Sequence, residues 1–301
     1  MFGLLDVTAS DAGIDQTASE ATVDGPVTCL DHWLDGSVRF GAPVAIAEVN
    51  TANYERDPFL DADELTLYFS ADRTGSFGGL DTWIATRAAI TDVFGSPVHD
   101  VEASSSGSES KLSITDDGLV MVIATDRPGG AGGTDIWQAT RTSTTHAWGP
   151  FDESHLSAVD DAASQYDPTF SLDGLHLYLA PYNGISPQQI AMASRASRTS
   201  DFSAPTAVAG LAGASNDADP ALSVDERLIV FASTRSGGSG GTDIWYASRA
   251  GPGQAFDAPT VALDINATAD DGDPWLSRDG CRLYFSSKRT GSWDLYTATV
   301  R

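Results

Sequence analysis

The most apolar stretches of the chain are short, and they lack the hydrophobic–polar alternation of a half-exposed strand. Residues 119–123 carry five apolar side chains in succession, and residues 65–70 and 283–287 are similar. An unbroken apolar run of this length predicts a strand with both faces covered by protein. Sheets stacked against one another would provide that cover.

These strands belong to a repeated module. A polar turn, such as 171–174, leads into the apolar strand, and a hairpin that is mostly Gly-rich leads to a third strand, such as 134–139. The five copies start 52 to 58 residues apart, at Asp57, Glu109, Asp167, Asp219 and Asp273. This period is typical of propeller blades, so we predict an all-β fold, a five-bladed β-propeller of four-stranded blades.

A fourth strand is expected where an aromatic residue closely precedes a proline, because proline suits an edge strand. The pattern occurs at 40–43, 94–97, 148–150, 202–205 and 256–259. Its first copy precedes every module, and the last module has none after it. We therefore predict that residues 37–49 pair with residues 294–299 as the fourth strand of the last blade and close the ring. The predicted organisation is a flexible leader over 1–27 and one propeller over 28–301.

The two cysteines fall in the blade that this closure would complete. Cys29 lies just before the closing strand, and Cys281 opens the second strand of the final module. The even count and this placement favour a disulfide, and two free buried thiols are the alternative. A disulfide would indicate an oxidising compartment.

Charge excludes one class of partner. The chain has 42 acidic and 17 basic residues, a formal net charge of -25, which would repel a nucleic-acid backbone. No run of 18 apolar residues is present, so no transmembrane segment is expected. The acidic surface fits either salt tolerance or recognition, and we expect a monomer.

The second hairpin carries a recognisable motif. Residues 124–137 read ATDRPGGAGGTDIW, and residues 233–245 are close to them. The motif resembles the TolB-type, WD40-like propeller repeat of bacterial envelope proteins, over residues 57–301, and is weakest in the third copy. The resemblance implies a periplasmic, cell-surface or secreted protein that docks proteins or ligands on one face of the propeller. It transfers no catalytic residue.

Charged residues recur at two places in the module. The acidic residues that start the modules should form a ring at the mouth of the central channel: Asp57, Glu109, Asp167, Asp219 and Asp273. Each hairpin except the third pairs an arginine with a following aspartate: Arg73 with Asp81, Arg127 with Asp135, Arg235 with Asp243, and Arg289 with Asp294. We interpret these pairs as ion pairs or hydrogen bonds that hold the hairpins.

A ring of carboxylates would repel itself unless a cation or neighbouring arginines offset the charge. Asp219, Asp271 and Asp273 lie in Asp-rich loops near the predicted mouth and offer the oxygen ligands that Ca²⁺ prefers. No EF-hand spacing is present. The sequence therefore predicts a Ca²⁺ site as one way of balancing the ring.

Two functions remain open. The first is a non-catalytic binding or scaffold propeller that docks a protein or a carbohydrate, with Tyr166, Tyr182 and Asn183 of the atypical third module as a sugar-contacting edge. The second is a glycoside hydrolase that uses two of the funnel carboxylates. Residues 237–241 match the G-x-S-x-G pattern of serine hydrolases, but they lie in a hairpin whose counterpart has no serine, so we interpret them as a turn.

Overall fold

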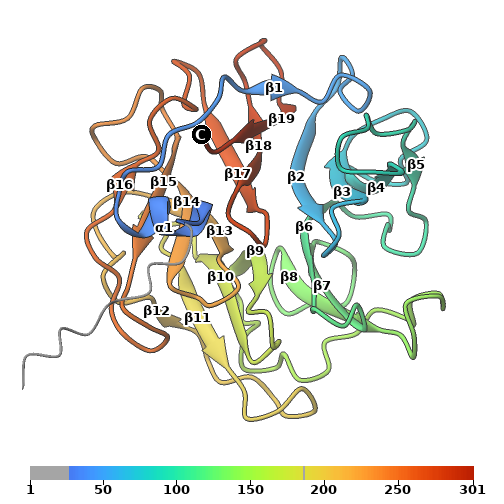
Figure 1. Cartoon of the computed structure of the whole chain (residues 1–301). Coiled ribbons are helices and arrows are strands. Elements are labelled where there is room, and N and C mark those ends of the chain that lie inside the picture. Colours follow the sequence, from blue (N-terminus) through green and yellow to red (C-terminus); the bar gives the residue numbers. More distant parts are fainter. Residues whose placement is uncertain (1–26, 186) are drawn as a thin grey trace, which may run out of the picture.

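Five antiparallel sheets surround a central axis in the computed structural model, which describes residues 27–185 and 187–301 (Figure 1). This arrangement confirms the predicted five-bladed β-propeller. Apart from Val27, the predicted leader lies outside the described residues. No helix in the described part of the chain is long and apolar enough to cross a membrane.

Each blade begins with its innermost strand. The first blade comprises β2 (Glu55–Leu60), β3 (Thr66–Ala71), β4 (Asp81–Thr86) and β5 (Val98–His99). The second comprises β6 (Glu109–Ile114), β7 (Val120–Thr125) and β8 (Asp135–Thr140). The third comprises β9 (Ser164–Phe170), β10 (His176–Tyr182), β11 (Ala191–Ser194) and β12 (Thr206–Ala207). The fourth comprises β13 (Asp217–Leu222), β14 (Leu228–Ser233), β15 (Asp243–Ser248) and β16 (Thr260–Val261). The fifth comprises β17 (Asp271–Leu276), β18 (Arg282–Ser287), β19 (Asp294–Thr299) and the N-terminal β1 (Val44–Ala45).

The outermost strands are shorter than predicted. In place of a strand over 37–49, two residues pair with β19, and Phe40 adds an isolated bridge to Val300. In the second blade the fourth strand is reduced to a single bridge between Gln138 and Asp152. The proline that was expected within the fourth strand lies just before it. The aromatic residue that precedes this proline, such as Phe94 or Phe256, is buried. This aromatic residue therefore anchors the segment through the core.

The core lies between blades, which explains why the second strands are apolar on both faces. All six residues of β14 are buried. Val122 of the second blade belongs to the same hydrophobic cluster as Leu177 of the third, and Tyr178 of the third packs with Ile229 of the fourth. Each strand thus buries one face against the blade before it and the other against the blade after it.

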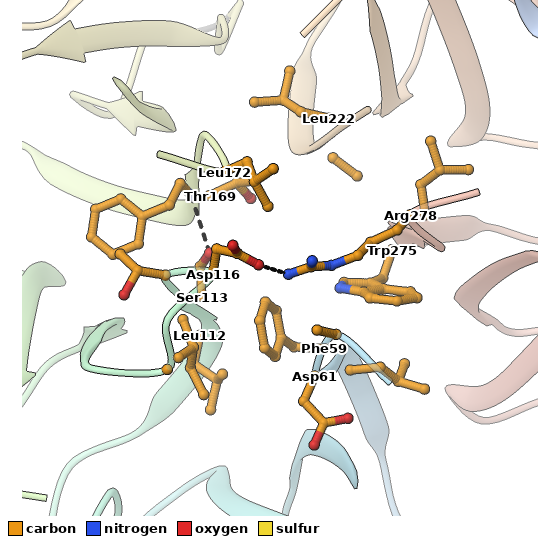
Figure 2. A pocket seen from close by; sticks show the side chains of 18 of the residues that line it. Phe59, Asp61, Leu112, Ser113, Asp116, Thr169, Leu172, Leu222, Trp275 and Arg278 are labelled. Carbon is orange, nitrogen blue, oxygen red and sulfur yellow. Dashed lines mark hydrogen bonds and ion pairs between the residues drawn. The ribbon is translucent and has the colours of Figure 1, made fainter. Parts of the chain in front are cut away.

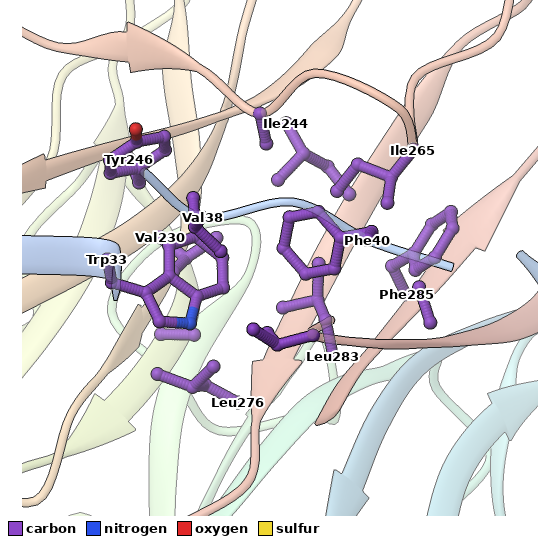
Figure 3. Packing of buried hydrophobic residues seen from close by; sticks show 14 of the residues in the cluster. Trp33, Val38, Phe40, Val230, Ile244, Tyr246, Ile265, Leu276, Leu283 and Phe285 are labelled. Atoms are coloured by element: carbon purple, nitrogen blue, oxygen red, sulfur yellow. The ribbon is translucent and has the colours of Figure 1, made fainter. Parts of the chain in front are cut away.

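The ring is closed by the N-terminal segment, as predicted. Helix α1 (Cys29–Leu34) begins with a capping box at Thr28 and places Trp33 fully inside the core. The Trp33 indole nitrogen donates to the carbonyl of Gly280 at 2.9 Å, and its ring lies edge-on to Phe40 (Figure 3). Helix α1 is therefore held by both packing and a hydrogen bond.

The predicted disulfide is present beside this helix. Cys29 and Cys281 are bonded, with 5.0 Å between their Cα atoms and a sequence separation of 252 residues. The bond joins the first residue of helix α1 to the residue directly before β18, the second strand of the last blade. In the chain-entropy model, a loop of this length stabilises the fold by about 5 kcal/mol.

Candidate functional site

Four aspartates of the predicted ring lie together in the central channel. Asp57, Asp167, Asp219 and Asp273 occupy the third or fourth residue of their innermost strands, where the pairing with the next strand shifts register. Their φ angles lie between 52° and 59°, a left-handed conformation that aspartate tolerates better than most residues. All four side chains are buried.

Backbone hydrogen bonds link neighbouring members of the ring. The amide of Asp219 donates to Oδ2 of Asp167 at 3.2 Å, and the amide of Asp273 donates to Oδ2 of Asp219 at 3.1 Å. Each of these carboxylates thus binds the backbone of the next blade. Part of the ring's role is structural.

The fifth member of the ring differs from the prediction. Glu109 is the first residue of β6, two positions before the ring, and Lys111 occupies the ring position of the second blade. Three copies show the stagger directly, because an acidic residue stands two positions before the Asp-Pro step at Glu55, Asp217 and Asp271. The ring therefore consists of four aspartates and one lysine.

The hairpin arginines contact these earlier acids and not the predicted aspartates. The ion pairs are Arg73 with Glu55, Arg127 with Glu109, Arg235 with Asp217, and Arg289 with Asp271. The same arginines donate to the carbonyls of Val49, Ala103, Leu211 and Ile265 in the loops between blades. Each pair therefore ties a hairpin to the preceding inter-blade loop.

The aspartates that follow the arginines hold the hairpin backbone instead. Asp135 accepts from the amide of Gly132 at 3.0 Å, and Asp243 accepts from the amide of Gly240 at 3.1 Å. Asp81 accepts from the amide of Phe77 in the same way. In the fifth blade, Asp294 accepts from the hydroxyl of Thr290. The predicted ion-pair partner was wrong, because the acid that pairs lies on the adjacent strand.

The third blade has lost both partners of this ion pair together. Gln165 replaces the buried acid, and the hairpin after β10 carries no arginine. The Gln165 amide donates to Asp161 at 2.9 Å. A neutral residue in this position needs no counter-ion, so the hairpin sequence is free to change.

The predicted Ca²⁺ ligands are regrouped by the fold. Asp57, Asp219 and Asp273 each place a carboxylate oxygen within 4.8 Å of the others, and we call them the three-aspartate cluster. Asp271 is not part of it, because its carboxylate pairs with Arg289 at 2.8 Å. Two of the three predicted ligands, Asp219 and Asp273, therefore lie in this cluster, and Asp271 lies outside it.

The carboxylates of this cluster are not equivalent. Arg56 donates to both oxygens of Asp273 at 2.9 Å. Burial would raise the pKa of Asp273, but the Arg56 guanidinium lowers it below its usual range. Burial and the charge of Asp273 raise the pKa of Asp57 to about 7. Burial also raises the pKa of Asp219 and of Asp167.

A funnel of about 550 Å³ opens above the ring on the hairpin face of the propeller. Its floor includes Asp57, Asp167 and Asp219, and Tyr166 and Tyr182 form part of its wall. Asn183 lies in an adjoining depression that shares both tyrosines. The fold therefore brings the predicted sugar-contacting edge next to the acidic ring.

The wall also contains residues that the sequence analysis missed. Each blade contributes the residue directly before its third strand or, in the third blade, its counterpart: Leu80, Thr134, Gln188, Thr242 and Trp293. The backbone position is equivalent in every blade, while the side chain is threonine in two blades and different in each of the other three. The sequence signal for these residues was that the side chain varies at this one position while the rest of the repeat is regular. Arg56 lies 4.5 Å from the centre of the Trp293 ring and connects this wall to the floor.

Comparisons with known proteins show the fold. No protein-family model matches the chain, and no curated protein is similar to it in sequence. TolB from Acinetobacter baumannii is similar with a TM-score of 0.52 and 13% identity over 84% of this chain, which spans 56% of that protein. A protein of unknown function from Dyadobacter fermentans gives 0.53 and 13%, covering 88% of this chain and 99% of that one.

A glycoside hydrolase is also similar. The catalytic domain of the GH62 α-L-arabinofuranosidase from Coprinopsis cinerea gives a TM-score of 0.58 and 11% identity, covering 87% of this chain and 97% of that one. At these identities the likeness establishes architecture and not activity. The chain thus has the propeller fold of TolB-like proteins, as its hairpin motif indicated, and this fold is shared with a glycoside hydrolase.

Proposed function

We propose that this chain is a non-catalytic saccharide-binding propeller. The observation that carries the proposal is the funnel, whose lining combines the aromatic residues Tyr166, Tyr182 and Trp293 with hydroxyl, amide and carboxylate groups. Aromatic rings pack against the apolar faces of sugars, and polar groups accept and donate the hydrogen bonds of sugar hydroxyls. Ser108, Thr134 and Asn216 supply such groups in the same wall.

The size of the funnel favours a small polar ligand over a docked protein. Its volume of about 550 Å³ falls within the range of ligand pockets. A stable protein interface needs about 800 Å² from each partner. A saccharide of a few residues suits the funnel, and a longer glycan would extend over the depression at Asn183.

The state of the carboxylates supports binding over hydrolysis. A glycosidase needs an acid and a second carboxylate that both reach the sugar. Asp273 is 0% exposed and both of its oxygens are engaged by Arg56. Oδ2 of Asp167 and Oδ2 of Asp219 each accept from a backbone amide of the next blade. These groups are arranged to hold the ring together.

One observation favours a glycoside hydrolase as the second candidate. Asp57 has a pKa raised to about 7 beside Asp273, whose pKa is lowered. Two carboxyl groups with separated pKa values are the usual pattern of an acid and its partner in catalysis. Their oxygens lie within 4.8 Å of each other, which is closer to the spacing of retaining than of inverting enzymes.

Binding and hydrolysis are separated by two measurements on the same protein. Affinity electrophoresis in gels that contain soluble polysaccharides should show retardation, and Tyr182→Ala or Trp293→Ala should weaken it by about tenfold in Kd. Tyr54→Ala is the matched control, because Tyr54 is an exposed tyrosine outside the funnel. Retardation lost equally in the control would contradict the proposal. Release of nitrophenol from nitrophenyl glycosides, abolished by Asp57→Asn, would establish the hydrolase instead.

The disulfide supports a location outside a reducing cytoplasm. Cys29 and Cys281 are bonded, and such bonds persist in the periplasm, on the cell surface and in secreted proteins. The TolB-type motif has the same implication. We therefore propose that the saccharide is met in the envelope or outside the cell.

A further inference from the structure

The opposite mouth of the channel contains a second cavity of about 500 Å³. The innermost strands end here, and their C-terminal halves supply aromatic and aliphatic walls at Phe59, Leu112, Leu222 and Trp275 (Figure 2). Phe59 and Trp275 lie edge to face with 6.4 Å between ring centres. This cavity opens on the other face and combines these apolar walls with a buried lysine, so it would take a different ligand from the funnel.

Lys111 is the anomalous residue of this cavity. It lines the wall, it is only 4% exposed, and its ammonium makes one hydrogen bond, at 3.5 Å, to the carbonyl of Pro274. No carboxylate lies within ion-pair distance of it among the residues that the structure describes. Buried lysines are rarely left without a partner, because desolvation of the ammonium is costly. The geometry thus leaves room for an acceptor from outside the chain.

The carboxylates at the mouth are already engaged. Asp116 pairs with Arg278 across the opening (Figure 2). Asp117 pairs with Arg198. Asp61 accepts from backbone amides of its own turn, and burial raises its pKa. The acids at this end therefore make no hydrogen bond to Lys111. The ring aspartates Asp57, Asp167 and Asp219 act on its charge through the channel, but none of them bonds its ammonium, so its remaining N–H groups are open to an acceptor. Because the carboxylates at the mouth are paired or hydrogen-bonded, they repel an incoming anion less than the same number of free carboxylates would.

The ion pair across the opening leaves access to the cavity. Arg278 and Asp116 have about two fifths of their side chains exposed, and exposed pairs contribute about 0 to 1 kcal/mol. Separating them to admit a ligand therefore costs little. Lys111 lies deeper than this pair, because β6 runs outward from Lys111 toward Asp116.

We propose that this cavity binds a small aromatic carboxylate. The aromatic ring packs between Phe59, Trp275 and Leu222, and the carboxylate accepts hydrogen bonds from the ammonium of Lys111. Such a bond is charge-assisted and lies in a water-poor site, where it is stronger than in solution. The inference is independent of the saccharide funnel, which opens on the other face.

Isothermal titration calorimetry on the full chain tests the proposal with three probes of one shape: naphthylacetate, naphthylacetamide and naphthylethylamine. The carboxylate should bind at least about tenfold more tightly than the neutral amide, and the amine should bind most weakly. Lys111→Met should remove the preference for the carboxylate while circular dichroism shows a folded propeller. Arg39→Met is the matched control, because it removes one exposed positive charge away from the cavity.

A second variant keeps the test decisive if Lys111→Met does not fold. Leu222→Trp fills the cavity from a partly buried position and should abolish binding of all three probes. Equal affinity for the carboxylate and the amide in the unmodified protein would overturn the proposal. So would binding that survives Leu222→Trp, or no binding of naphthylacetate at millimolar concentration.

Discussion

We predict that Asp160 destabilises the folded state at neutral pH and that the substitution Asp160→Asn increases its stability. The residue stands in the loop before the third blade, and Asn266 stands at the same position before the fifth. Asn266 accepts from the amide of Ile244 at 2.8 Å and donates to its carbonyl at 3.0 Å. Asp160 accepts from the amide of Ile136 at 2.9 Å, but its second oxygen is buried without a partner. An ionised carboxylate cannot make the donated bond.

The pH dependence follows from the pKa of this carboxyl group. Burial, together with the charges of Asp135 and Glu153, raises the pKa of Asp160 to about 7. The folded state therefore binds this proton more tightly than the unfolded state, in which the pKa is about 3.9. Stability from this group is present below pH 4 and is lost as pH rises from about 4 to 7.

The expected magnitude comes from the same pKa difference. The full difference corresponds to about 4 kcal/mol, and the remaining exposure of the side chain reduces it to about 2 kcal/mol. Asp160→Asn should therefore raise the free energy of unfolding by about 1 to 2 kcal/mol at pH 8 and change it little at pH 4.5.

Urea denaturation of both proteins at the two pH values is the assay, because groups common to both cancel in the difference. Asn266→Asp is the converse control and should destabilise the protein at pH 8 more than at pH 4.5. An equal effect of Asp160→Asn at both pH values, or a loss of stability at pH 8, would refute the reasoning.

Three further predictions concern closure and charge. Replacing Cys29 and Cys281 by serine should lower the free energy of unfolding by about 3 to 5 kcal/mol, and a reductant should then leave the thermal midpoint of the variant unchanged. Arg235→Gln leaves Asp217 as a buried, unpaired charge and should cost about 3 kcal/mol in urea denaturation, with Asp217→Asn in the same chain recovering part of the loss. Ca²⁺ bound at the three-aspartate cluster would stabilise the folded state by about 2.7 kcal/mol at a concentration of 100 times Kd. Dialysed protein should therefore gain thermal stability when Ca²⁺ is added, and the Asp57→Asn variant should not. If neither protein gains stability, the site is excluded.

The fold was predictable because its signals repeat. Unbroken apolar strands, a period near 54 residues and a displaced fourth strand all point to one closed ring. The length of the outer strands was not predictable in the same way. In four outer segments, packing between blades buries the aromatic residue and keeps the segment in place with a strand of only two residues. These aromatic residues are Phe40, Phe94, Phe202 and Phe256.

The site was predictable only where each residue followed its repeat. Asp57 and its three counterparts are marked by the proline that follows, whereas Glu109 was chosen for its acidity and Lys111 was overlooked. Arg127 lies eight residues before Asp135 in the chain, yet it pairs with Glu109 on the adjacent strand. Trp293 reaches the funnel from a repeat position that stands out only by its divergence between blades, and divergence alone does not show on which face a side chain lies.

The bond between Cys29 and Cys281 makes the greater part of the propeller a covalently closed circle. A single cut by a protease in any exposed hairpin between these residues would leave two pieces joined by the disulfide, as well as by the sheets around them. Such a nicked molecule would keep its mass on a non-reducing gel and separate only after reduction. A single chain break in this part of the protein therefore does not release a fragment as long as the disulfide stays oxidised.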